Sequence, residues 1–102
     1  MYTNSTTLEI LKNCPSLRPY SGRGMYGQQC PALAVDDVSE GIHQLFESAR
    51  EHLPADQALD GLQALVANFR TDTLGFRTVM YWPSIDWTDI QDNTSEEAFA
   101  AV

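Results

Sequence analysis

The sequence predicts an α+β fold, in which a helical hairpin packs on one face of a small, mainly antiparallel sheet of two or three strands. Residues 37–53 and the run from Pro54 to about Arg70 place apolar residues at steps of three and four, the spacing of amphipathic helices. Residues 75–82 are rich in β-branched and aromatic residues, which is typical of a strand. The predicted order of elements is α-β-β-α-α-β. The length of 102 residues suits one domain.

One short helix and two short strands are predicted before the hairpin. A Thr-x-x-Glu capping box indicates a helix at about residues 6–13. Strands are predicted at residues 17–20 and 28–35, on either side of a glycine-rich bend. Because Pro31 has no amide hydrogen to donate, the second strand is expected to lie at an edge of the sheet or to begin after Pro31.

The two long helices have clear start signals and a very short connection. Asp37 is expected to cap the first helix, with Glu40 three residues later, and Pro54 suits the first turn of the second. Apolar spacing predicts the inner face of the hairpin. Its members are Val38, Ile42, Leu45, Phe46, Ala49 and Leu53 in the first helix, and Leu59, Leu62, Leu65, Val66 and Phe69 in the second.

Side chains of the best strand, within residues 75–82, should alternate between two faces. One face would carry Phe76, Thr78, Met80 and Trp82, and the other Arg77, Val79 and Tyr81. Met80 and Trp82 are expected in the core. The single domain is predicted over residues 1–85, followed by an acidic tail over residues 86–102, part of which Trp87, Ile90 and Phe99 could dock.

The net charge of −8 is unevenly distributed along the chain. Residues 36–60 sum to −6 and residues 78–102 to −5, whereas residues 1–35 and 61–77 sum to +2 and +1. Direct binding of duplex nucleic acid through a broad basic face is therefore not predicted, because neutralising phosphates needs many lysines and arginines. An acidic chain either meets a basic partner or owes its solubility to the charge.

No cofactor, metal site or membrane segment is predicted. No apolar run reaches the length of a membrane span and no signal peptide is visible, so a cytoplasmic location is expected. In that reducing compartment Cys14 and Cys30 are expected to be free thiols, although a disulfide between them stays open. A zinc site would need two further ligands from distant positions, and His43 and His52 do not have the spacing of a helical metal pair.

The segment YSGRGMYG, residues 20–27, is the first candidate binding site. Glycines let the backbone approach a ligand closely, successive amides can bind an anion, and an arginine offers a forked donor to phosphate. The candidate ligand-binding residues are Tyr20, Ser21, Gly22, Arg23, Gly24 and Tyr26. Neither a Walker motif nor a helix-opening GxGxxG is present, so a simple hairpin loop is the alternative.

The acidic surface of the helical hairpin is the second candidate site. Glu40, Glu47 and Glu51 recur at about two turns and one turn of a helix. Carboxylates in such a row can imitate phosphates and occupy the basic nucleic-acid groove of another protein. With Trp87 in the acidic DWTD segment, these residues are the candidate partner contacts. A solvated helix face is the alternative.

No residue pattern selects a catalytic group, so an enzyme is not predicted. A nucleophile needs an adjacent base and an orienting group, and neither cysteine has them in an identifiable motif. The run RPYSGRGMYGxxC, residues 18–30, resembles an element of small uncharacterised proteins of bacteriophages and prophages. This resemblance implies a mobile-element origin and an accessory or counter-defence role, which proteins of this size usually perform by binding.

The leading functional prediction is a non-enzymatic binding protein that inhibits or modulates a host protein through its acidic surface. A first alternative is a nucleotide or anion binder that uses the glycine-rich loop. A second alternative is a structural module that forms a homodimer through its helical hairpin.

Overall fold

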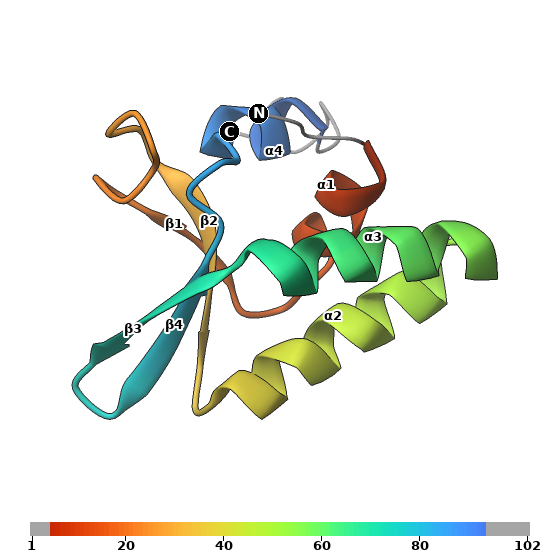
Figure 1. Cartoon of the computed structure of the whole chain (residues 1–102), viewed down its shortest axis with the longest axis horizontal. Helices are drawn as coiled ribbons and strands as arrows, with labels where there is room; N and C mark the ends of the chain where they lie inside the picture. Colours follow the sequence, from red (N-terminus) through yellow and green to blue (C-terminus); the bar gives the residue numbers. More distant parts are fainter. Residues whose placement is uncertain (1–4, 94–102) are drawn as a thin grey trace, which may run out of the picture.

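The computed structural model describes residues 5–93, with the side chains of residues 5–90, as a sheet with helices on one of its faces (Figure 1). The predicted α+β class is confirmed, but the sheet has four antiparallel strands instead of two or three, and a further helix follows it. The elements are α1 (Ser5–Lys12), β1 (Leu17–Tyr20), β2 (Cys30–Val35), α2 (Val38–His52), α3 (Ala55–Asn68), β3 (Arg70–Leu74), β4 (Arg77–Tyr81) and α4 (Trp87–Asn93).

The strand β2 lies inside the sheet, whose order is β1-β2-β4-β3. The prediction that Pro31 marks an edge strand or precedes the strand is therefore wrong. The Pro31 carbonyl accepts the Trp82 amide at 3.1 Å, so the proline nitrogen faces that same neighbour. The Trp82 carbonyl, which would otherwise need a donor there, accepts the Ile85 amide at 3.1 Å. Pro31 is tolerated because this carbonyl has another donor.

The strand β3 occupies a segment for which no strand is predicted. Its sequence RTDTL has no apolar alternation, and most of its side chains are exposed. It pairs only with β4, and an edge strand with polar side chains resists pairing with other chains. The turn between the two strands uses Gly75 at φ 62°, a conformation that favours glycine. Helix α3 accordingly ends at Asn68, before Arg70.

The predicted start of α2 is confirmed by its hydrogen bonds. The Asp37 carboxylate accepts the Glu40 amide at 2.9 Å, and the Glu40 carboxylate accepts the Asp36 amide at 3.0 Å. These bonds satisfy two amides that lie outside the helical ladder. The predicted capping box of α1 is wrong in register, because the helix begins at Ser5 and Thr6 lies inside it.

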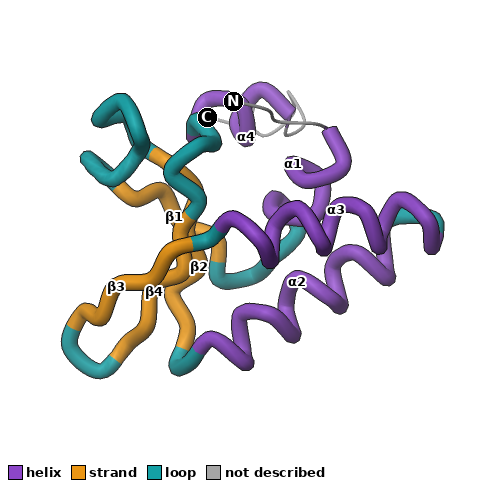
Figure 2. The backbone as a smooth tube through the Cα atoms, viewed as in Figure 1, coloured by secondary structure: helices purple, strands orange, loops and turns teal. Residues whose placement is uncertain are grey.

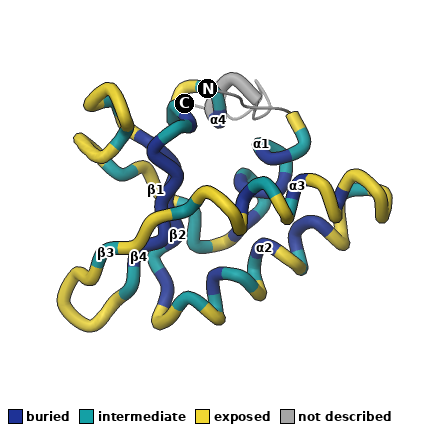
Figure 3. The backbone as a smooth tube through the Cα atoms, viewed as in Figure 1, coloured by how far each residue is buried: buried dark blue, intermediate teal, exposed yellow. Residues whose placement is uncertain are grey.

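Side-chain alternation along β4 separates two apolar clusters, as the sequence predicts. Met80 and Trp82 join the main core beneath the helices, whereas Val79 and Tyr81 pack on the opposite face of the sheet. The Trp82 ring is fully buried, and its Nε1–H donates to the Leu65 carbonyl of α3 at 2.8 Å. This bond joins the sheet to the helical layer. Figure 3 shows buried backbone concentrated where these layers meet.

Helix α4 docks onto the domain within the segment predicted as an acidic tail. Ile90 is buried in the main core, and the half-buried Trp87 packs against it, as expected for these two side chains. Residues 94–102, which include Phe99, lie outside the described residues.

The predicted inner face of the hairpin is partly wrong. Phe46, Leu59 and Val66 are expected inside, yet they are 53%, 58% and 42% exposed. Helix α3 instead approaches α1 through small residues. An added Cβ at Gly61 would lie 2.6 Å from Ile10 Cδ1, so no larger side chain fits without a shift of its neighbours. This close approach turns the large side chains of α3 towards the surface.

We predict that Trp82→Phe lowers the free energy of unfolding by about 2–4 kcal/mol, because it removes the indole donor and leaves unfilled volume in the core. Urea unfolding followed by circular dichroism measures the change. Trp87→Phe is the matched control, with an expected cost of about 1 kcal/mol or less for a half-buried ring. Equal costs for the two variants would contradict the role assigned to Trp82.

Candidate functional site

The glycine-rich segment forms an irregular loop between β1 and β2 (Figure 2). Gly22 and Gly27 adopt φ of 75° and 80°, so both positions require glycine. Four successive amides of the loop already have acceptors within the protein. The acceptors are the Gln28 carbonyl for Gly24, the Pro83 carbonyl for Met25, the Gln28 side chain for Tyr26 and the Gly24 carbonyl for Gly27. These four amides are therefore not free to cradle an anion.

Tyr20 and Arg23 are held against the sheet by Asp72 of β3. The Tyr20 hydroxyl donates to the Asp72 carboxylate at 2.7 Å, and this bond raises the pKa of Tyr20. The Arg23 guanidinium lies 3.4 Å from the same carboxylate and 5.6 Å from the centre of the Tyr20 ring. The loop thus places an arginine over an aromatic ring on the sheet face opposite the helices.

The other candidate residues of the loop lie at its exposed side. The Ser21 hydroxyl accepts a hydrogen bond from Gln29 at 3.1 Å. Met25 and Tyr26 project into solvent at the tip, and Tyr26 is 78% exposed. The structure therefore groups Tyr20 with Arg23, and leaves Tyr26 as a free ring at the edge.

The three predicted glutamates share one side of α2, but they differ in what they contact. Glu40 is occupied by the Asp36 amide and by Gln44. Glu47 pairs with Arg50 at 3.0 Å, and the guanidinium lowers the pKa of Glu47. Glu51 is exposed. The fourth candidate, Trp87, is on α4, whose main neighbours are α1 and β2, so the structure does not bring it to this row.

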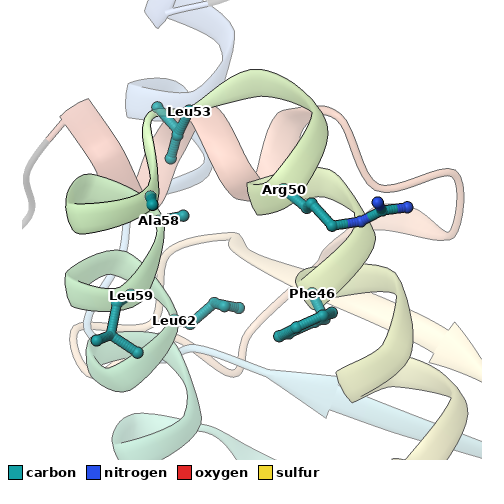
Figure 4. A pocket seen from close by; sticks show the side chains of 7 residues that line it. Phe46, Arg50, Leu53, Ala58, Leu59 and Leu62 are labelled. Carbon is teal, nitrogen blue, oxygen red and sulfur yellow. The ribbon is translucent and has the colours of Figure 1, made fainter.

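A groove between α2 and α3 is the site that the sequence does not predict. It encloses about 390 Å³. It is lined by Phe46, Arg50, Leu53, Ala55, Ala58, Leu59 and Leu62 (Figure 4). The apolar spacing predicts that Phe46 and Leu59 lie in the core. For this reason the sequence does not indicate a groove at their position. The small residues Ala58 and Gly61 were the available signal, since they allow a close helix contact that excludes larger neighbours.

Neither cysteine offers a reactive thiol. Both are free and buried, as expected for at least one of them, and they belong to separate apolar clusters on opposite faces of the sheet. Burial raises the pKa of Cys14 to about 12 and also raises the pKa of Cys30. A nucleophilic cysteine needs the opposite shift.

Within residues 5–93 no group of three or more histidine, cysteine or acidic side chains could hold a metal ion. None of the described helices is both long and apolar enough to cross a bilayer.

Comparisons with protein-family models, with curated proteins and with solved structures found no match for this chain.

We predict that part of the stability of the protein is lost above pH 9. The pKa of Cys14 rises from 9.0 to about 12 on folding, so between these values the folded state binds more protons than the unfolded state. The free energy of unfolding then falls as pH rises, by at most about 1.4 kcal/mol per pH unit for one thiol. Below pH 9 this contribution is fully present.

Urea unfolding at pH 8 and pH 10.5 tests this coupling, with Cys14→Val as the comparison. The variant should lose less stability between the two pH values than the unchanged protein. An identical loss in both proteins would show that the Cys14 thiol does not cause it.

Proposed function

We propose that this chain is a non-enzymatic binding protein that holds an amphipathic helix of another protein in the groove between α2 and α3. The exposure of Phe46, Leu59 and Val66 around the half-buried Leu62 is the observation that carries the proposal. Single exposed apolar residues are ordinary, but a continuous apolar strip beside a groove is typical of an interaction site.

The apolar strip formed by Phe46, Leu59, Leu62 and Val66 has dimensions that suit a helical partner. Leu59, Leu62 and Val66 follow one another at steps of three and four along α3, so they span about 10 Å of helix length. An amphipathic helix laid in a groove uses the same spacing for its own anchors. Phe46 of α2 lines the groove together with Leu59 and Leu62, and it supplies the aromatic contact that often dominates such an interface (Figure 4).

The charge of the helical hairpin favours a basic partner, although the charged residue that lines the groove itself is Arg50. Residues 37–68 contain six carboxylates, from Asp37 to Asp60, against the single cation Arg50. A partner helix with lysines and arginines beside its apolar ridge would be attracted to this surface, and the attraction would speed association. A second copy of the chain would instead bring two acidic surfaces together. We therefore favour a partner of opposite charge over the homodimer.

This function keeps the predicted role of the helical acids and adds an apolar anchor to it. Glu47 and Glu51, which line a separate hollow beside Asn13 and Pro15, would attract the basic partner, and the groove would hold it. The resemblance of residues 18–30 to phage and prophage proteins suggests a host protein as the partner, in the cytoplasm, with inhibition or modulation as the result.

We predict that the protein binds an 18-residue amphipathic peptide of leucine and lysine, and that Phe46→Ser and Leu59→Ser each weaken this binding at least tenfold. Isothermal titration calorimetry with the peptide at low micromolar protein measures the affinity. Because both side chains are more than half exposed, the free energy of unfolding of each variant should lie within about 1 kcal/mol of that of the unchanged protein.

Phe76→Ser is the matched control, since Phe76 is a fully exposed ring on the β3–β4 turn, and it should bind as the unchanged protein does. Equal binding of a leucine–glutamate peptide, or full binding by Phe46→Ser, would refute the proposal. Sedimentation analysis adds a second check. A dimer that Phe46→Ser dissociates would replace the proposed partner with a second copy of the chain.

A further inference from the structure

We propose that the sheet face opposite the helices binds single-stranded nucleic acid. We call this surface the arginine face, because Arg18, Arg70 and Arg77 project from it and Arg23 joins them from the glycine-rich loop. It includes neither the α2–α3 groove nor the acids of α2, so it is independent of the proposed protein partner. No described helix covers this side of the sheet (Figure 1).

The strand register places two of the arginines in one row. Arg18 of β1 is paired with Ala32 of β2, Ala32 with Tyr81 of β4, and Tyr81 with Arg70 of β3. Paired residues project from the same face of a sheet. The strands that carry Arg18 and Arg70 are three strand spacings apart, which is about 14 Å. Arg77 is four residues before Tyr81 on β4, so it shares this face.

The arginines of this face keep free donors. Each guanidinium carries five N–H groups. Arg18 donates to its neighbouring Leu17 carbonyl and Arg77 to the Ala34 carbonyl, each at 2.7 Å, while the Asp36 carboxylate lies 4.0 Å from Arg77. Arg70 is exposed, and its guanidinium has no hydrogen bond or ion pair with any described residue.

The arginine face is positive although the whole chain carries a net charge of −8. Four of the six lysines and arginines lie on it, together with Asp72 and, at its rim, Asp36. Most other described carboxylates belong to the helices or their caps, on the far side of the sheet. Charges separated by more than the Debye length, about 8 Å at physiological ionic strength, are largely screened from one another, which weakens the effect of the helical acids on this face.

Two exposed aromatic rings belong to the connecting segments at the two ends of the sheet. Tyr26 belongs to the loop that carries Arg23, and Phe76 belongs to the β3–β4 turn next to Arg77. Figure 1 shows the loop and the turn projecting at opposite ends of the sheet. Unstacked bases can lie on such rings while arginines contact the backbone phosphates.

Single strands fit this surface better than the other polyanions. A duplex offers no unstacked bases to Tyr26 and Phe76, and the four arginines contact too few phosphates to hold it by charge alone. An acidic peptide would pair with the guanidinium groups but would leave both aromatic rings unused. The combination of forked donors and free rings therefore points to nucleotides.

Fluorescence anisotropy with a labelled 12-residue oligothymidylate, and with oligouridylate of equal length, tests the proposal in 50 mM salt. Three or four phosphate contacts predict that affinity falls about 20- to 50-fold between 50 and 200 mM salt. The double variant Arg18→Ala/Arg70→Ala should bind at least tenfold more weakly. The matched control Arg50→Ala, which removes one exposed cation from the helical side, should stay within twofold of the unchanged protein. Stronger binding of one oligomer assigns the ligand to DNA or to RNA.

Three results would overturn the proposal. The first is an affinity that the double variant retains, and the second is a duplex bound as tightly as the single strands. The third is binding of labelled polyglutamate without binding of either oligomer, which would assign the face to an acidic protein. Because the mutated arginines are exposed, a circular dichroism spectrum and an unfolding midpoint like those of the unchanged protein will show that the fold is intact.

Discussion

The alternation of side chains along β4 decides which surfaces of this protein are covered and which are free. Met80 and Trp82 point to one side, where the fully buried indole of Trp82 holds α3 through the Leu65 carbonyl. Val79 and Tyr81 point to the other side, where Tyr20 packs against them and no described helix follows. With the helices on one side only, arginines of β1, β3 and β4 remain at the opposite surface.

Sequence patterns predict the elements that have strong apolar periodicity or distinct caps. The helix capped by Asp37 and the face assignments of Met80 and Val79 follow directly from spacing. The strand β3 could not be found in this way, because RTDTL has no apolar face and its place in the sheet comes from pairing with β4. The interior position of Pro31 depends equally on a distant bond, between the Trp82 carbonyl and the Ile85 amide.

The candidate sites also differ in what determines them. Some follow from local residue spacing, and others depend on contacts between segments that are distant in the sequence. Spacing alone places Glu47 and Glu51 on one side of α2, and the structure agrees. Spacing cannot show that the α1–α3 contact uses small residues. It therefore cannot show that Phe46 and Leu59 remain exposed. The arginines of the open face are far apart in the sequence, and only the order of the strands brings them together.

The central claim is that the protein presents two opposite binding surfaces, an apolar groove between two acidic helices and an arginine face. Amide chemical shifts of the ¹⁵N-labelled protein, recorded during separate titrations with the leucine–lysine peptide and with oligothymidylate, test it most directly. We expect the peptide to shift amides of α2 and α3, and the oligonucleotide to shift a separate set in β1, β3, β4 and the glycine-rich loop. The same amides shifting in both titrations would contradict the claim.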